Sequence, residues 1–224
     1  YKSLKSITVG CQESDETFDN YIGYLLPMHD YGKAAIRFQC KHVAGQQLYS
    51  KPITDKDKLF AAGEHGEAGY YFLLDEIRKK YECEDDFLEL LNHHKIVFQH
   101  HAKFGVKDLS EYTYVYGADK EDLKRDERYR KEFRTFLNGF FGNVAETYKF
   151  IDMKHGGAAA LAGFCTFVDW LASACFEVET ERVDLRQYYE SRKQEAFELV
   201  NGYNLAPVID KSNIEFSKLF QVKN

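Results

Sequence analysis

Two adjacent residues in an otherwise apolar stretch indicate possible metal chemistry. The sequence "LLPMHDYGKAAIRFQ", residues 25–39, places His29 beside Asp30, and Lys33 follows about one helical turn later. Imidazole nitrogens and carboxylate oxygens are ligands that suit divalent Mn, Fe, Co, Ni and Zn ions. Because a carboxylate can bridge two ions, an adjacent His-Asp pair can serve both halves of a two-metal site.

Further residues of the same two types recur far along the chain. They are His65, the doublet His100-His101, and Asp169 within an apolar segment. Each of these alone is more often a hydrogen-bonded structural residue than a metal ligand. A buried aspartate without a partner is costly, however, and a cation would supply that partner. Helical bundles build such sites from side chains on several facing helices, so these residues can converge in one core.

The motifs around these residues resemble the HD metal-dependent phosphohydrolase superfamily. "HDYGKAAIRFQ" is similar to H-D-[IL]-G-K-x-x-x-x-F-Q, with Phe38 and Gln39 in place. "EHGEAG" and "IVFQHHAKFG" resemble its later histidine blocks, and "GFCTFVDWLAS" resembles G-[LF]-x-x-x-A-D-W-[IL]-A-S. Together, over residues 20–220, they resemble the HD nuclease domain of the CRISPR-associated helicase-nuclease of type I systems.

This resemblance implies a buried dinuclear metal site. Its cofactors would be two divalent transition-metal ions, Mn, Fe, Co or Ni, with Mg as an alternative. Asp30 would bridge the ions and Lys33 would contact a phosphate oxygen or hold Asp30 in place, which gives both residues catalytic roles. The implied ligands are His29, Asp30 and Asp169 for one ion, and Asp30, His65, His100 and His101 for the other.

The chain departs from the family pattern at several positions. The family usually carries another histidine on its first helix, whereas residues 1–28 contain none. That ligand lies upstream of Tyr1, or the first metal site is weaker here. Ala102 stands where glycine is common, and Val168 replaces the usual alanine. The sequence contains no G-x-x-x-x-G-K-[ST] motif, so the ATPase is expected on a separate subunit or elsewhere in a longer protein.

The function implied by the resemblance is a metal-dependent single-stranded DNA nuclease of type I CRISPR interference. Its expected partners are single-stranded DNA, an ATP-dependent helicase domain or subunit, and a guide-RNA surveillance complex. Two alternatives stay open: an HD phosphohydrolase acting on nucleotides, and a non-catalytic interaction module. The net charge of −6 counts against a stable complex with duplex DNA, because neutralisation of phosphates dominates such affinity. It does not exclude an enzyme that receives DNA from a partner.

The elements that position these residues are expected to be helices. With 44% hydrophobic residues and three prolines, the composition fits one compact core and favours helix. The resemblance implies an all-α, mainly helical HD-domain bundle. Apolar spacing predicts helices over residues 18–39, from Glu64 to Tyr81, and over 85–101 with Asp85 or Asp86 as a cap.

The charge and hydropathy of the second half also predict helices. Residues 118–135 alternate in charge, which is typical of a solvated helical face. The most apolar segment, 153–176, is predicted to be a buried core helix rather than a membrane span, with Trp170 in the core. A further helix is expected over 184–203.

The sequence also suggests where the domain ends and in which compartment the protein acts. We expect residues 1–206 to form the HD nuclease domain and residues 207–224 to form a C-terminal tail that leads towards a helicase. The five cysteines show no C-x-x-C spacing, and the sequence shows no signal peptide. A cytoplasmic protein with reduced thiols and no membrane partner is therefore expected.

Overall fold

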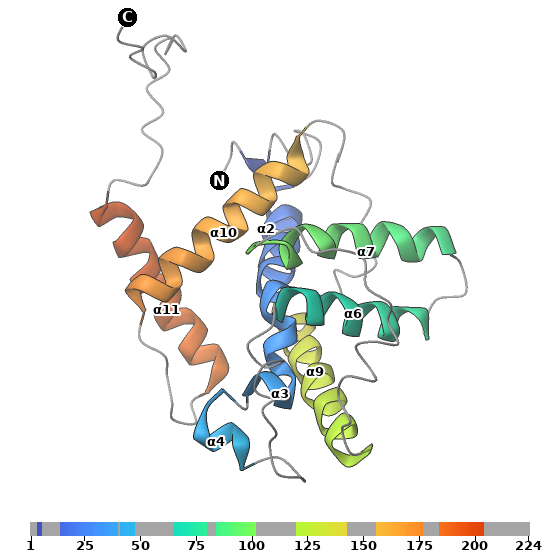
Figure 1. Ribbon diagram of the computed structural model, residues 1–224. Coiled ribbons are helices and arrows are strands. Elements are labelled where there is room, and N and C mark those ends of the chain that lie inside the picture. The colour runs from blue at the N-terminus through green and yellow to red at the C-terminus, as the bar shows by residue number, and fades with distance from the viewer. Residues whose placement is uncertain are drawn as a thin grey trace, which may run out of the picture. The chain divides into compact units, whose positions relative to one another are not determined.

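All regular structure in the described part of the chain is helical. The computed structural model describes residues 4–5, 14–39, 41–47, 65–79, 84–101, 120–142, 156–176 and 184–203. Its main elements are α2 (Asp15–Leu25), the 3-10 helix η1 (Leu26–Ala34), α3 (Ile36–Gln39), α4 (Val43–Gln46), α6 (His65–Arg78), α7 (Glu84–Phe98), α9 (Lys120–Phe141), α10 (Gly157–Cys175) and α11 (Leu185–Gly202) (Figure 1). The predicted all-α class is confirmed.

The chain forms two compact units, Tyr1–Phe176 and Glu177–Asn224. The first unit contains every helix from α2 to α10. The second contains α11, whose first turn is capped because the Asp184 side chain accepts hydrogen bonds from two backbone N–H groups. The tail expected over 207–224 lies outside the described residues, and the domain limit at residue 206 stays a prediction.

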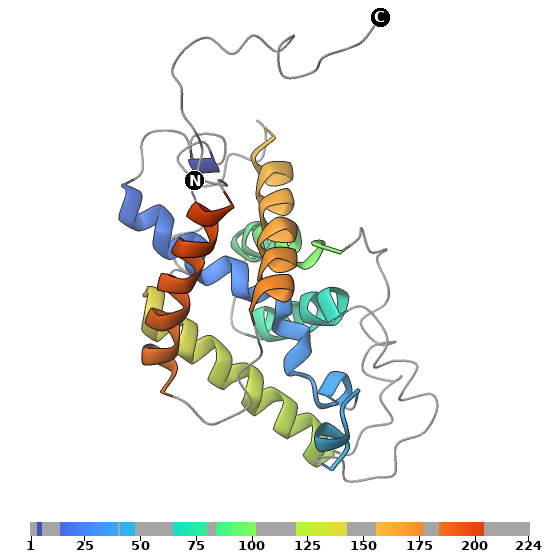
Figure 2. The ribbon, with the colours of Figure 1, turned by 90° about the vertical axis from the view of Figure 1, so that its left-hand side faces the viewer.

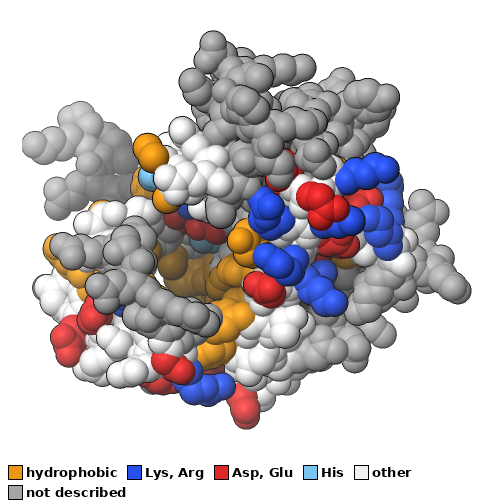
Figure 3. All heavy atoms as spheres, turned by 90° about the horizontal axis from the view of Figure 1, so that it is seen from below, with side chains coloured by type: hydrophobic (Ala, Val, Ile, Leu, Met, Phe, Trp, Pro, Cys, Tyr) orange, Lys and Arg blue, Asp and Glu red, His pale blue; other side chains and the backbone are white. Residues whose placement is uncertain are grey.

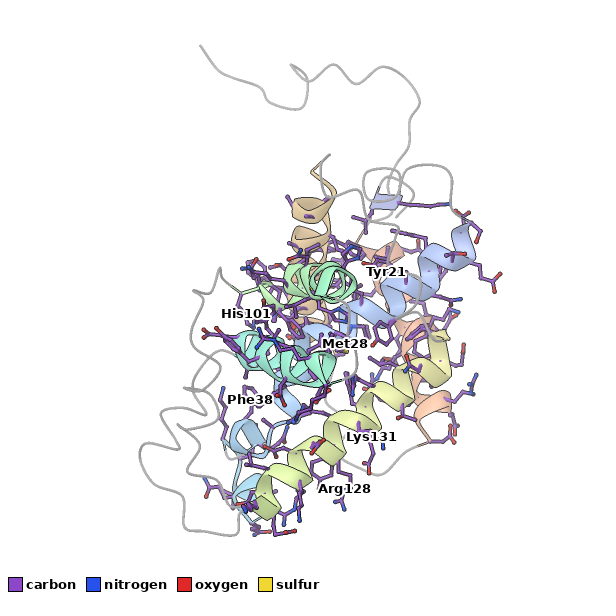
Figure 4. All side chains as sticks on the ribbon, turned by 90° about the vertical axis from the view of Figure 1, so that its right-hand side faces the viewer. Tyr21, Met28, Phe38, His101, Arg128 and Lys131 are labelled. Atoms are coloured by element: carbon purple, nitrogen blue, oxygen red, sulfur yellow. The ribbon has the colours of Figure 1, made fainter. Side chains whose placement is uncertain are left out.

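The first unit is built around η1. Helices α6 and α7 lie side by side and antiparallel, and α10 passes across their ends (Figures 1 and 2). Helices α2, α6, α7 and α9 all contact η1. On η1, Met28 and Tyr31 are fully buried, and Met28 lies in the interior between these helices (Figure 4). The His29-Asp30 pair is therefore carried by an element that four helices surround.

The helix predicted over residues 18–39 is divided into α2, η1 and α3, so this prediction is wrong for its middle part. Pro27 stands in the first turn of η1, where its missing N–H costs no hydrogen bond. A 3-10 helix has three residues per turn, so residues three apart lie in line. Met28 and Tyr31 therefore share the buried side, and Asp30 and Lys33 share another.

Gly32 allows η1 to touch α6. A Cβ at this position would overlap the backbone carbonyl of His65 and lie 2.7 Å from the backbone nitrogen of Gly69. Backbone atoms of a packed helix cannot move aside as a flexible side chain can. This contact gives a physical reason for glycine in the H-D-x-G-K motif.

We expect Gly32→Ala to lower the free energy of unfolding by about 1–3 kcal/mol, as overpacking does. Urea unfolding measures this loss. The matched control is Gly139→Ala in α9, where a Cβ meets nothing within 4 Å. Because alanine favours helix over glycine, the control should gain up to about 1 kcal/mol. Two variants of equal stability would contradict the close approach of η1 and α6.

The charged helix α9 is confirmed, but its expected solvation is wrong on one face. Asp122, Asp126 and Arg130, spaced by four residues, are buried. The Arg130 guanidinium lies 4.1 Å from the centre of the Phe72 ring on α6. One face of α9 therefore directs charged side chains towards the interior of the unit.

A largely enclosed carboxylate on α6 accounts for the inward position of Arg130. Nε of Arg130 donates to Oε1 of Glu76 over 2.9 Å, and a nitrogen of Arg134 lies 2.9 Å from Oε2. The hydroxyl of Tyr31 donates to the same Oε2 over 2.7 Å. Glu76 on α6 therefore links α9 to η1 at Tyr31, the residue that follows Asp30. Burial, together with the negative charge of Glu76, raises the pKa of Tyr31.

The apolar helix α10 is confirmed, but it is not a buried core helix. Its buried residues are Gly157, Leu161 and Cys165, whereas Phe167 is 46% and Trp170 67% exposed. The prediction that Trp170 packs in the core is therefore wrong. Successive helical residues differ by about 100° around the axis, so a residue next to one that faces the interior need not face it too.

Among the described helices, α10 alone is long and apolar enough to cross a bilayer by length and composition. Its contact with α7 and the position of Asp169 beside His29 nevertheless place it against the other helices of the first unit.

The start of helix α7 differs from the sequence prediction. It begins at Glu84, so the predicted cap at Asp85 or Asp86 is wrong. Acidic residues favour the first turn of a helix as well as its cap, which makes the two positions hard to separate in sequence.

His93 is a structural residue of α7. It is 2% exposed, its Nδ1 lies 2.9 Å from the Tyr21 hydroxyl, and burial lowers its pKa from 6.5 to about 4. Between these pH values the unfolded chain binds a proton that the folded protein does not. The free energy of unfolding should therefore fall as the pH falls from about 6.5 to about 4, by up to about 3 kcal/mol from this residue.

Urea unfolding of His93→Gln across this pH range tests that effect, since glutamine does not titrate. We expect the acid-dependent loss of stability to shrink relative to wild type. The exposed residue His42 provides the control, and His42→Gln should keep the wild-type pH dependence. An unchanged pH profile in His93→Gln would contradict the burial of a neutral imidazole.

Candidate metal centre

Four elements bring the six predicted ligands together. η1 carries His29 and Asp30, and α6 begins with His65. His100 and His101 directly follow the last turn of α7, and Asp169 projects from α10. Residues far apart in the sequence thus meet where the ends of α6 and α7 approach η1 and α10.

One group of potential ligands surrounds the His29 ring. Its Nε2 lies 3.3 Å from Oδ1 of Asp30 and 3.5 Å from Oδ1 of Asp169. The rings of His29 and His100 are 4.5 Å apart between centroids. His29, Asp30 and His100 each offer one ligand atom, and these atoms lie within 4.8 Å of one another.

A second group contains three imidazoles. His65, His100 and His101 also offer ligand atoms within 4.8 Å of one another. Nε2 of His65 lies 3.2 Å from Nε2 of His100 and 3.1 Å from Oδ1 of Asp30. Asp30 therefore stands between the groups, as a bridging carboxylate would. His100 takes part in both groups, whereas the sequence assigned it to one.

The hydrogen bonds of two histidines determine which nitrogens can bind a cation. Nδ1 of His29 lies 2.6 Å from the carbonyl of Leu26, and Nδ1 of His100 lies 2.9 Å from the carbonyl of Val97. A carbonyl only accepts, so Nδ1 carries the proton in both rings and Nε2 of a neutral ring holds a lone pair. Such backbone acceptors are typical of metal-binding histidines.

These lone pairs face other acceptors. Nε2 of His29 points at carboxylate oxygens, and Nε2 of His100 faces Nε2 of His65. Nε2 of His29 and Oδ1 of Asp30 are buried and make no hydrogen bond of good geometry. Lys33 donates to the other oxygen of Asp30 over 2.8 Å. A cation between Nε2 of His29 and Oδ1 of Asp30 would satisfy both of these buried acceptors, so the residues fit a divalent metal.

Burial and neighbouring charges shift the pKa values of three candidate ligands. Burial, with the charges of His29 and His101, lowers the pKa of His100 to about 4, so this ring is neutral at pH 7. Burial also lowers the pKa of His101. For Asp30, burial opposes ionisation. The imidazoles of His65 and His29 and the Lys33 ammonium outweigh it and hold the pKa well below its usual range.

The comparison with protein families identifies the family of this chain. The profile described as "Cas3, HD domain" matches residues 2–176. The chain belongs to the Cas3 HD-domain family. The resemblance inferred from the motifs is thereby confirmed, and the match ends where the first compact unit ends. The comparisons found no matching curated protein and no matching solved structure.

Family membership supports the general chemistry of this HD domain. The Cas3 HD family implies a metal-dependent hydrolase, a nuclease associated with type I CRISPR systems. HD domains bind divalent metals, and this one has two groups of His and Asp side chains that could hold them.

Lys33 lies on the open side of the centre. Its ammonium is 2.8 Å from both carboxylate oxygens of Asp30, which η1 places in line with it. The Lys33 side chain is 36% exposed and His101 is also exposed. Both residues can therefore meet a molecule that approaches from solvent.

Several supporting residues were not identified from the sequence. The hydroxyl of Thr166 donates to the carbonyl of His100 over 2.9 Å. This bond joins α10 to the end of the α7 segment that carries His100. Burial, helped by the charges of Asp169 and Asp30, raises the pKa of Cys165 to about 12. That thiol is neutral and therefore a poor metal ligand. Thr166 lies three residues before Asp169, and this helical spacing was the available signal.

Proposed function

We propose that the chain is a single-stranded DNA nuclease that acts in type I CRISPR interference with two divalent transition-metal ions. The observation that supports this most strongly is the convergence of His29, Asp30, His65, His100, His101 and Asp169 with their acceptor atoms facing one another. Imidazole-rich sites favour Mn, Fe, Co or Ni over Mg, which prefers oxygen ligands.

Several residues of the centre would have defined roles in hydrolysis. Two bound ions would activate water and stabilise charge on the attacking and leaving oxygens of a phosphodiester. Asp30 would bridge the ions. The carbonyls of Leu26 and Val97 hold the rings of His29 and His100 with Nε2 turned inward. Lys33 would place a positive charge beside a phosphate oxygen at the open side.

The charge distribution favours a nuclease that receives DNA from a partner. The chain has a net charge of −6, and along α9 Lys124 pairs with Glu121 and Arg128 with Glu132. On the face seen from below, Lys and Arg side chains are interspersed with Asp and Glu (Figure 3). Such a mixed surface gives little general affinity for nucleic acid. We therefore propose that a helicase domain or subunit and a guide-RNA surveillance complex deliver the strand.

Nicking of circular single-stranded DNA tests the proposal. We expect cleavage by protein loaded with Mn, Co or Ni, and none after chelation. Covalently closed circles exclude attack from an end, and nucleoside triphosphates in parallel reactions test the nucleotide-hydrolase alternative. Triphosphate turnover without DNA cleavage, or absence of both activities from a metal-loaded protein, would contradict the nuclease proposal.

A further inference from the structure

Lys41 is an exposed cation whose side chain is held in place by an aromatic ring. Its Nζ lies 3.9 Å from the centre of the Phe38 ring, a cation–π distance. Its backbone N–H donates to the carbonyl of Phe38 over 3.2 Å. Lys41 is thus positioned by a neighbour three residues before it.

Among the described residues, the Lys41 ammonium has no carboxylate partner of the kind that many cations of this acidic chain have. Lys5, Lys79 and Lys124 each pair with an acidic side chain. For Lys41, the part of the chain that the structure describes shows only the Phe38 ring as a partner. A cation kept in place without a counter-ion is available to bind an anion.

Two contacts connect this cation to the metal centre. The Phe38 ring meets the His65 ring edge-to-face at 5.3 Å between centroids, so one ring separates Lys41 from a candidate ligand. Nε2 of Gln39 donates to the carbonyl of Lys33 over 2.7 Å, which fixes α3 beside η1. The positive charge of Lys33 also contributes, after burial, to the lowered pKa of Lys41, so the two ammonium groups are close enough to interact.

The Lys33 ammonium contacts Asp30, and only the Phe38 ring lies between Lys41 and His65, so both cations lie close to the candidate metal ligands. We propose that Lys41, positioned over Phe38, binds a backbone phosphate of single-stranded DNA next to the phosphate that is cleaved. Lys33 is directed to the scissile phosphate by its place beside Asp30, and Lys41 contacts the neighbouring one. This inference rests on the proposed nuclease function. It also assigns roles to the F-Q pair: Phe38 positions Lys41, and Gln39 holds α3 against η1.

The salt dependence of DNA binding tests Lys41 without catalysis. Fluorescence anisotropy would measure binding of a labelled oligothymidine to the full chain, with chelator, over a series of salt concentrations. Each phosphate contact to a single strand contributes about 0.7 to the slope of log K against log salt. We expect Lys41→Gln to lose about 0.7 of slope, and Lys41→Arg to retain it. Lys124→Gln, which removes an exposed lysine on α9, should keep the wild-type slope.

Steady-state kinetics of the metal-loaded protein provide the second readout. Lys41→Gln should raise KM for single-stranded DNA about threefold to tenfold, the range of a partly exposed charge contact, with kcat unchanged. Hydrolysis of bis(p-nitrophenyl) phosphate should be unaffected, because this small diester has no neighbouring phosphate. A loss of diester hydrolysis would instead indicate damage to the metal centre and would contradict the assigned role.

The outcomes separate this inference from the proposed function. Wild-type protein that binds the oligonucleotide but cleaves no DNA would contradict the nuclease proposal, while the slope would still report on Lys41. If Lys41→Gln and Lys124→Gln give the same slope, the Lys41 site is wrong even where cleavage is normal. A chain that binds no single-stranded DNA at any salt concentration would overturn both.

Discussion

Asp30→Ala should abolish phosphodiester cleavage and reduce the number of metal ions that the protein binds. Oδ1 of Asp30 lies 3.1 Å from Nε2 of His65 and 3.3 Å from Nε2 of His29. Its removal therefore takes a ligand from the first group and the neighbouring carboxylate from the second. We expect kcat to fall by on the order of 10³-fold or more, since this change removes transition-state charge stabilisation at its centre. Single-turnover cleavage of circular single-stranded DNA and elemental analysis measure the two effects.

A matched aspartate controls for general damage. The Asp75 side chain on α6 is 47% exposed and pairs with Lys79 over 2.6 Å, and Asp75 belongs to neither ligand group. Asp75→Ala should keep cleavage and metal content within about twofold, as surface substitutions do. Asp30→Asn, which preserves shape but removes the charge, should fail like Asp30→Ala. Wild-type rates in either Asp30 variant would mean that this carboxylate is not a ligand.

Glu76→Gln should cause the largest loss of stability among single substitutions of charged residues outside the metal centre. The Glu76 carboxylate accepts from Arg130 and Tyr31 and pairs with Arg134, and its side chain is 12% exposed. Breaking one partner of a buried ion pair leaves an uncompensated charge and costs about 3–5 kcal/mol. Urea unfolding in the presence of chelator measures this loss separately from metal binding.

The control for Glu76 is an ion pair in solvent. Glu121 and Lys124 are 2.9 Å apart on α9, and their side chains are 68% and 70% exposed. Exposed pairs contribute at most about 1 kcal/mol, so Glu121→Gln should change the unfolding free energy little. If both substitutions lower the free energy of unfolding equally, the contacts of Glu76 with Arg130, Arg134 and Tyr31 do not stabilise the packing of α6, α9 and η1.

Local sequence patterns predicted most helices because apolar spacing acts within a single element. The helix expected from Glu64 begins at His65, and the charged segment 118–135 lies largely within α9. The 3-10 geometry of η1 was not predicted, since periods of 3.0 and 3.6 are difficult to distinguish over nine residues. What selects the tighter turn is the packing of Met28 and Tyr31 against the surrounding helices, which is a tertiary effect.

The burial of charged side chains on α9 could not be predicted from local sequence either. Arg130 is inside because it meets Glu76, 54 residues earlier in the chain, and nothing in the alternating charges of α9 indicates that partner. Trp170 was assigned to the core from its apolar neighbours, yet it is exposed. Hydropathy gives the composition of a helix, whereas its orientation depends on the elements that pack on it.

The candidate site was predictable as a set of residues but not as an arrangement. The motifs predicted six candidate ligands and Lys33, and the structure brings these seven side chains close together. The place of His100 in both ligand groups depends on the carbonyl of Val97 and on Thr166, contacts that spacing in the sequence does not reveal. Lys41 lies outside every motif and is recognisable through its contact with Phe38.

These side chains are proposed to hold two ions with Asp30 between them. Crystals loaded with Mn and measured at its absorption edge would show whether they do. We predict two anomalous peaks about 3.5–4 Å apart, as in two-metal sites, one beside His29 and Asp169 and one beside His65 and His101. A protein without peaks after loading, or with its metal bound elsewhere, would contradict the account, and a single peak would remove the bridging role of Asp30.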